Sequence, residues 1–158
     1  MCLVLDSNIL HNVFDVNSKD HSSFKPVLNW LYKNKRTCLV YGGTKYKSEL
    51  KRNSKYLSYI SELKRNKKVK EVKDRLVDIE EKRVKDYVNS EQFDDPHIVA
   101  IFRVSHCKVL VSNDKRADKY LKMKSLYETG RKPSIYRNEN HEHLLNEDNI
   151  VNIKNVES

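Results

Sequence analysis

Three aspartates in this 158-residue chain stand at the ends of apolar segments. Asp6 follows the apolar run 2–5, Asp114 comes shortly after the run 109–111, and Asp95 precedes an apolar helical segment. Carboxylates that gather at one spot repel each other unless cations lie between them. Oxygen ligands without accompanying Cys or His select Mg²⁺ or Mn²⁺, and a pair of such ions activates water and stabilises the leaving oxygen of a phosphodiester. These aspartates therefore predict a site for one or two ions and phosphodiester hydrolysis.

Further polar residues extend this acidic set. Glu49 lies within a predicted helix that follows the second apolar run, so it is expected at the same edge. Asn8, two residues after Asp6, could brace that carboxylate or orient a metal-bound water, and Ser112, two residues before Asp114, could do the same. Taken singly, each acid also has an ordinary interpretation as a cap, turn or surface residue.

The elements that must position these residues alternate between strands and helices. Strands are expected at 2–5, 37–41 and 108–111, with weaker ones at 68–72, 133–136 and 150–153. Helices are expected at 24–31 after a Ser22–Ser23 cap, and at 44–53, 56–63, 76–88, 96–105 and 116–123. This alternation predicts an α/β fold with a central, mostly parallel sheet and helices on both faces. In such a sheet the ligand crevice lies outside the carboxyl ends of the strands.

Composition limits the class of protein. A chain of this length forms one domain that buries about 70% of its unfolded surface, so it needs no disulfide framework. The three cysteines, Cys2, Cys38 and Cys107, are odd in number and lie in or beside apolar runs, which predicts free thiols and a reducing cytoplasm. Apolar stretches are too short for a membrane span or a cleavable signal, so we expect a soluble protein without membrane contact.

The net charge of +9 is unevenly distributed. Residues 45–87 contain 15 Lys and Arg against 8 Asp and Glu, which accounts for most of the basic excess. A local positive surplus attracts polyanions, of which nucleic acid is the commonest, although a Lys-rich helical face can equally be solvated surface.

Four segments resemble the motifs of the PIN domain, a small α/β nuclease fold. Residues 3–10 resemble its strand ending in Asp-x-Asn, and 47–50 its acidic helix motif. Residues 95–101 resemble the helix of the third acid, and 109–114 the strand that ends in Ser/Thr-x-Asp. The likeness covers residues 1–120.

By this resemblance the metal-binding, catalytic acids are Asp6, Glu49, Asp95 and Asp114, supported by Asn8 and Ser112. It also implies a ribonuclease of the prokaryotic toxin or defence type, which an inhibitory protein partner restrains and which commonly forms a homodimer.

The chain departs from the family pattern in several places. Asp94 precedes Asp95, which leaves the metal-facing carboxylate undecided, and Asp118 lies one helical turn after Asp114 and could add or replace a ligand. The charged helical insertion at 64–91 is longer than expected, and the C-terminal extension at 125–158 matches no motif.

Two functions follow from the sequence. The first is a Mg²⁺- or Mn²⁺-dependent endonuclease acting on single-stranded or structured RNA, with basic residues that hold the backbone: Lys45, Lys47, Arg52, Lys115 and Arg116. DNA stays open as a substrate, because phosphate contacts do not distinguish the sugar. The second is a non-catalytic nucleic-acid-binding or scaffold module that uses the basic face. The acidic set favours the first, because clustered carboxylates weaken the binding of a polyanion.

Overall fold

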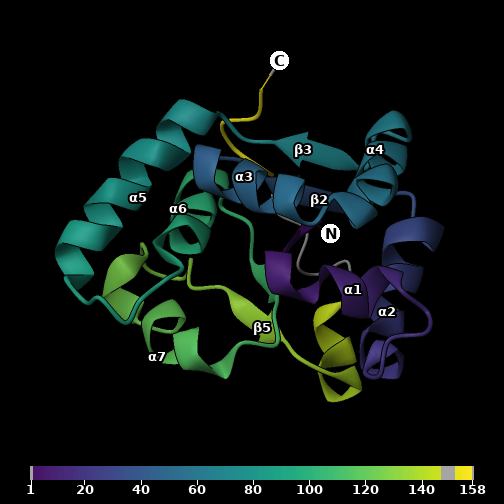
Figure 1. Ribbon diagram of the computed structural model, residues 1–158. Coiled ribbons are helices and arrows are strands. Elements are labelled where there is room, and N and C mark those ends of the chain that lie inside the picture. Colours follow the sequence, from purple (N-terminus) through teal and green to yellow (C-terminus); the bar gives the residue numbers. More distant parts are fainter. Residues whose placement is uncertain (1, 147–151, 158) are drawn as a thin grey trace.

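A computed structural model describes residues 2–146 and 152–157 (Figure 1). Its centre is a five-stranded parallel sheet with the order β3-β2-β1-β4-β5. The strands are β1 (Cys2–Leu5), β2 (Cys38–Tyr41), β3 (Val69–Glu71), β4 (Val109–Val111) and β5 (Ser134–Tyr136). The predicted α/β class with a parallel sheet is confirmed.

Seven α-helices connect and cover these strands within the described residues. They are α1 (Leu10–Phe14), α2 (His21–Lys33), α3 (Thr44–Arg52), α4 (Leu57–Arg65), α5 (Asp74–Val88), α6 (Pro96–Ser105) and α7 (Asp118–Leu121). Short 3-10 turns complete the chain: η1 (Ser7–Ile9), η2 (Ser54–Tyr56), η3 (Lys115–Ala117), η4 (Lys124–Leu126) and η5 (Glu139–Leu144). Figure 1 shows α5 along the outer side of the molecule, where it packs against α6.

The inner strands owe their position to continuous apolar sequence. Every residue of β2 and β4 is buried, as are Leu3, Val4 and Leu5 of β1. Burying such a side chain contributes about 1.5–3 kcal/mol, so the three runs favour the centre of the sheet over either edge. The edge strand β3 reads Val-Lys-Glu and is only half-buried, as its charges require.

A tight turn between β2 and α3 brings the latter helix close to the sheet. A side chain at Gly42 would lie 2.5 Å from the carbonyl oxygen of Val72, and Gly43 has a φ of +91°, in the region that favours glycine. The amide of Gly43 donates to Asp74 Oδ1 at 2.9 Å. The glycine pair therefore fixes where α3, and with it Glu49, begins.

Two helix predictions need correction at their ends. Helix α2 begins at His21 rather than after the expected Ser22–Ser23 cap, and Pro26 lies inside it. Pro26 is the sixth residue of this helix, beyond its first turn, so its missing amide removes one hydrogen bond of the helix instead of opening it. The helix expected at 116–123 is divided into η3 and α7.

The segments outside the expected motifs belong to the central architecture. Within 64–91 the chain forms β3 and α5, and within 125–158 it forms β5, which pairs with β4. Of the strand expected at 150–153, residues 150 and 151 lie outside the described residues, and 152–153 form no strand.

The expectation of three free thiols was wrong. Cys2 and Cys38 are directly paired in the register of β1 and β2, with their Cα atoms 4.4 Å apart, and they form a disulfide. Cys107 is free and buried, and its thiol donates to the carbonyl of Cys2 at 3.2 Å. Sequence spacing could not reveal the pairing, because it depends on the strand register. No helix in the described part of the chain has the length and hydropathy that a bilayer crossing requires.

Candidate functional site

The carboxyl ends of β1 and β4 bring Asp6 and Ser112 together. Leu5 and Val111 are register partners in these neighbouring parallel strands, and the Asp6 amide donates to the Val111 carbonyl at 2.9 Å. One residue further on, the Ser112 hydroxyl donates to Asp6 Oδ2 at 3.0 Å, and both side chains are buried. The predicted meeting of the two strand ends is therefore present in the structure.

Asp6 is a carboxylate in an unfavourable environment for its charge. Only 3% of its surface is exposed, and burial, followed by the nearby charge of Asp95, raises the pKa of Asp6 to about 6. The Ser112 hydroxyl and the backbone amide of Asn8 oppose this shift. Asn8 thus supports Asp6 through its main chain, while its own side chain is exposed rather than braced against the acid.

Asp95 occupies the residue before α6, whose first residue is Pro96. Its side chain makes no capping hydrogen bond, so the carboxylate is not used to begin the helix. Burial raises the pKa of Asp95, His97 opposes the shift, and the charge of Asp114 adds to it. Asp94 is exposed, and its carbonyl accepts from Lys45 Nζ at 3.3 Å. Asp95 is therefore the acid that interacts with Asp6.

Glu49, from α3, lies between two polar partners. Ser7 Oγ donates to Glu49 Oε2 at 2.5 Å, and His97 Nε2 lies 2.5 Å from Oε1 without the alignment of a hydrogen bond. Partial burial opposes ionisation, but His97, Ser7 and Lys45 outweigh it and lower the pKa of Glu49. The charge of Glu49 is thus compensated, unlike that of Asp6.

Asp114 follows β4 and directs one oxygen toward the turn after it. Its Oδ1 accepts from the Arg116 amide at 3.0 Å and from Arg116 Nε at 3.2 Å. Its own amide donates to Ser112 Oγ at 3.2 Å, which links it to the hydroxyl that contacts Asp6.

Asp118 is used elsewhere. Its Oδ1 pairs with Arg137 Nη2, and Lys122 Nζ lies 3.9 Å from Oδ2. Asp118 is also not among the charges that shift the pKa of Asp6 or Asp95. The sequence-based suggestion that it adds or replaces a ligand therefore has no support in this arrangement.

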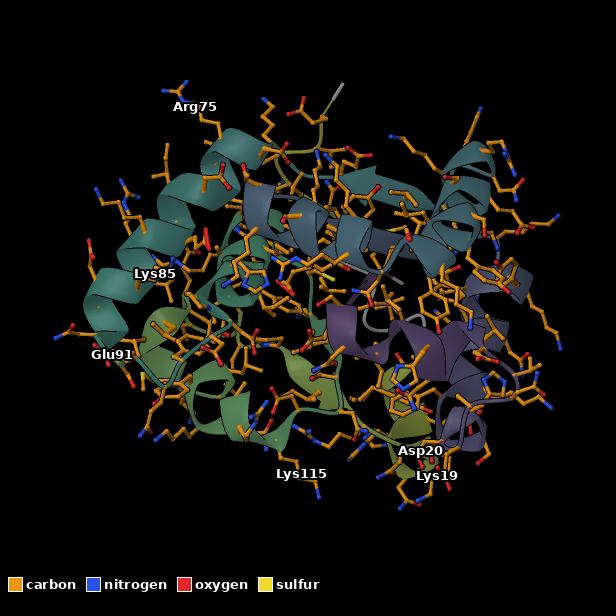
Figure 2. All side chains as sticks on the ribbon, viewed as in Figure 1. Lys19, Asp20, Arg75, Lys85, Glu91 and Lys115 are labelled. Atoms are coloured by element: carbon orange, nitrogen blue, oxygen red, sulfur yellow. A yellow bond between two sulfur atoms is a disulfide. The ribbon has the colours of Figure 1, made fainter. Side chains whose placement is uncertain are left out.

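The predicted backbone-binding residues divide into two groups. Lys45 lies beside Asp94 and acts on the charge of Glu49, and Arg116 lies against Asp114, with 88% of its side chain exposed. Lys115 extends outward from the chain after β4 (Figure 2), and Arg52 is also exposed. Lys47 instead pairs with Asp74 at 2.8 Å and Glu71 at 3.4 Å. Its role in nucleic-acid binding stays a prediction, and these two acids compete with phosphate for its charge.

His97 is a residue of the candidate site that the sequence analysis did not assign. It is 98% buried in the first turn of α6, and it acts on the charges of both Asp6 and Asp95 while it contacts Glu49. The available signal was its place two residues after Asp95, in the first turn of the helix that this acid precedes.

Metal binding can be judged from the donor groups. Within residues 2–146 and 152–157, no three His, Cys, Asp or Glu side chains converge closely enough to hold a metal ion as they lie. The chemistry of the donors nonetheless fits a hard divalent cation, because Asp6, Asp95 and Asp114 offer only oxygen ligands. The charge of Asp95 raises the pKa of Asp6, and the charge of Asp114 raises that of Asp95. No Lys or Arg in this part of the chain pairs with Asp6 or Asp95.

No protein-family model, curated protein or solved structure matched the chain in three comparisons.

Proposed function

We propose that the protein is a Mg²⁺- or Mn²⁺-dependent endoribonuclease with a PIN-like site. The observation that carries this proposal is the buried carboxylate of Asp6, which has no lysine or arginine partner among the described residues. Ser112 of the neighbouring strand end donates a hydrogen bond to it, and burial and the charge of Asp95 raise its pKa. A buried charge of this kind destabilises the fold unless a cation compensates it.

Each acid of the site and each residue that contacts it has a role in this proposal. Asp6, Asp95 and Asp114 would hold the ion, and Glu49 is the fourth acid of the set. Ser112 and the Asn8 amide fix the orientation of Asp6. When bound, the ion supplies Lewis-acid stabilisation of phosphate charge and a more acidic water. Hydrolysis by water requires no covalent enzyme intermediate, so no nucleophilic side chain is needed.

The nucleic acid would approach over the basic side chains beside the acids. Lys45 and Arg116 lie nearest to them, and Lys115 and Arg52 offer further exposed positive charge. Figure 2 shows Arg75 of α5 extending away from the protein, and Lys85 of the same helix is also exposed, so the basic excess of residues 45–87 is partly surface charge. That excess favours the second candidate, a module that binds nucleic acid without cutting it.

The biological setting belongs to the same proposal. A toxin or defence effector restrained by an inhibitory protein and a homodimer are extensions of the PIN-like resemblance, whereas the cytoplasmic location extends the prediction of free thiols. The Cys2–Cys38 disulfide opposes the location, because cytoplasmic reductants keep most thiols reduced. Thiol counting on protein isolated from cells under alkylating conditions separates the two, since a cytoplasmic protein should yield three reactive cysteines after denaturation.

The test is cleavage of a mixed single-stranded RNA and the matching DNA with Mn²⁺, Mg²⁺ or EDTA. Wild type should cut with metal and not with EDTA, and the double variant Asp6→Asn/Asp114→Asn should not cut although it folds and binds RNA. Asp74→Asn is the matched control, because this acid pairs with Lys47 and lies outside the proposed site. Binding without cleavage under every metal would favour the non-catalytic module, and cleavage by the double variant would sink the nuclease assignment.

A further inference from the structure

Glu49 connects the two segments that carry the buried aspartates. Its Oε2 accepts from Ser7, the residue directly after Asp6, and its Oε1 contacts His97, two residues after Asp95. These contacts span 42 and 48 positions in sequence, so one side chain of α3 ties η1 to the first turn of α6. A carboxylate in this position can set the separation of Asp6 and Asp95 without touching an ion.

The surroundings of Glu49 differ from those of a group that awaits a cation. Both of its oxygens have a close partner at 2.5 Å, and Lys45 adds a second positive influence. Among the described residues, the side chain that hydrogen-bonds to Asp6 is the neutral hydroxyl of Ser112, and the acid whose charge raises the pKa of Asp6 is Asp95 rather than Glu49. The carboxylates whose charge is least compensated are therefore the aspartates, Asp6 and Asp95, and not Glu49.

His97 is built into this connection. It is 98% buried, and neither ring nitrogen has an aligned hydrogen-bond partner among the described residues. Leaving buried polar atoms unaligned is costly, and contact with the Glu49 carboxylate is the interaction that offsets it. Packing alone would be served better by an apolar side chain at this position.

We propose that Glu49 is a positioning residue, held by Ser7 and His97, and that the ion is bound by Asp6, Asp95 and Asp114 without Glu49 as a direct ligand. This inference rests on the proposed metal-dependent activity and departs from the four-ligand set that the resemblance implies. Its distinctive consequence is that the shape and hydrogen bonds of residue 49 matter more than its charge.

Conservative and disruptive variants separate these roles. Glu49→Gln keeps an oxygen for Ser7 and a polar atom for His97, and His97→Gln keeps a nitrogen near the position of Nε2. Glu49→Ala and His97→Leu remove the connection. For each variant, Mn²⁺ affinity is measured by calorimetry, kcat and KM on the mixed single-stranded RNA are determined, and thermal unfolding establishes that the variant is folded. Asp6→Asn serves as the reference for loss of a ligand.

The inference predicts that both Gln variants stay within about threefold of wild type in Mn²⁺ affinity and kcat, while Glu49→Ala and His97→Leu lose about 10–100-fold in kcat. Should either disruptive variant fail to fold, the Gln variants still decide the question. Glu49→Gln that loses Mn²⁺ affinity as severely as Asp6→Asn would show Glu49 to be a ligand and overturn the inference. Unchanged kcat in the folded disruptive variants would also overturn it. If wild type binds no Mn²⁺, the proposed function itself fails.

Discussion

Two groups of acids follow strands of the same sheet and have opposite electrostatic environments. The site acids, Asp6, Asp95 and Asp114, lie near the carboxyl ends of the inner strands β1 and β4. Burial there raises the pKa of Asp6 to about 6 and also raises that of Asp95. The β3 acids, Glu71 and Asp74, end β3 and begin α5. Partial burial opposes their ionisation, but lysine contacts prevail and lower the pKa of both.

The difference lies in which cation the protein supplies. Lys64 lies 2.5 Å from Glu71, and Lys47 lies 2.8 Å from Asp74, so the β3 acids are neutralised within the chain. Asp6 and Asp95 receive no such lysine or arginine in the part of the chain that the structure describes. Uncompensated charge is therefore concentrated on Asp6 and Asp95, whereas Asp114 has Arg116 against one of its oxygens.

Exchanging one acid in each group gives the largest expected difference. Asp6→Asn should reduce RNA cleavage by roughly 1000-fold, because a ligand that supports several kcal/mol of transition-state stabilisation is lost. Asp74→Asn should change cleavage by no more than about twofold, since it removes the charge of a partly exposed ion pair and keeps Oδ1 as an acceptor for the Gly43 amide. Initial rates at saturating Mn²⁺ give both numbers, and equal losses would remove the distinction between the groups.

The pH dependence of stability should report the charge on Asp6. Its pKa is about 6 in the folded protein against an ordinary 3.8, so the folded state binds this proton more tightly. The destabilisation is absent below pH 3.8, develops as the pH rises toward 6, and is complete above that, where it amounts to about 3 kcal/mol.

Urea unfolding in EDTA measures this effect as a difference between two proteins. The advantage of Asp6→Asn over wild type should be about 3 kcal/mol at pH 7 and close to zero at pH 3.5, because the variant cannot ionise there. A difference that stays constant with pH would mean that Asp6 is not charged and uncompensated in the metal-free fold.

RNA affinity should distinguish lysines by their partners. Lys45→Ala and Arg116→Ala should each weaken RNA binding and reduce the slope of log affinity against log salt by about one, because each releases one phosphate contact. Lys47→Ala should leave the slope unchanged, since two acids, Glu71 and Asp74, hold its charge and its side chain is 32% exposed, against 88% for that of Arg116. A fluorescence titration at several salt concentrations on an uncleavable Asp6→Asn background tests all three, and a smaller slope for Lys47→Ala would support its predicted role.

The smallest expected effect is on the β3 acids themselves. Lys47→Ala should lower the free energy of unfolding by up to about 1 kcal/mol, because it removes a partly exposed pair that belongs to a small network. Urea unfolding with and without 0.5 M salt checks this, with roughly equal stability of the two proteins expected at high salt. A loss that persists at high salt would indicate a packing role for the lysine stem.

Much of the site was accessible from sequence because parallel strands place their ends together. The apolar runs before Asp6 and Asp114 predicted their shared edge, and Pro96 correctly marked the start of the helix after Asp95. The contact of Glu49 with His97 was not accessible, since it depends on how α3 packs beside α6.

The other contacts that the sequence did not reveal share that cause. The ion pairs of Lys47 depend on β3 and α5 reaching α3, and the Cys2–Cys38 disulfide depends on the register of two strands. Composition and periodicity report on single elements, whereas these contacts join elements that are far apart in sequence. The type of each element was therefore predicted more successfully than the partner of each side chain.

The most direct test of the account is Mn²⁺-dependent stabilisation at pH 7.5 in wild type, Asp6→Asn and Asp74→Asn. Thermal unfolding is followed with increasing Mn²⁺ and with EDTA, since an ion that binds only the folded state raises its stability with concentration. The account predicts that Mn²⁺ raises the midpoint of wild type and Asp74→Asn alike, and leaves that of Asp6→Asn nearly unchanged. Equal stabilisation of all three proteins, or no stabilisation of wild type, would contradict the claim that the site acids require a divalent cation.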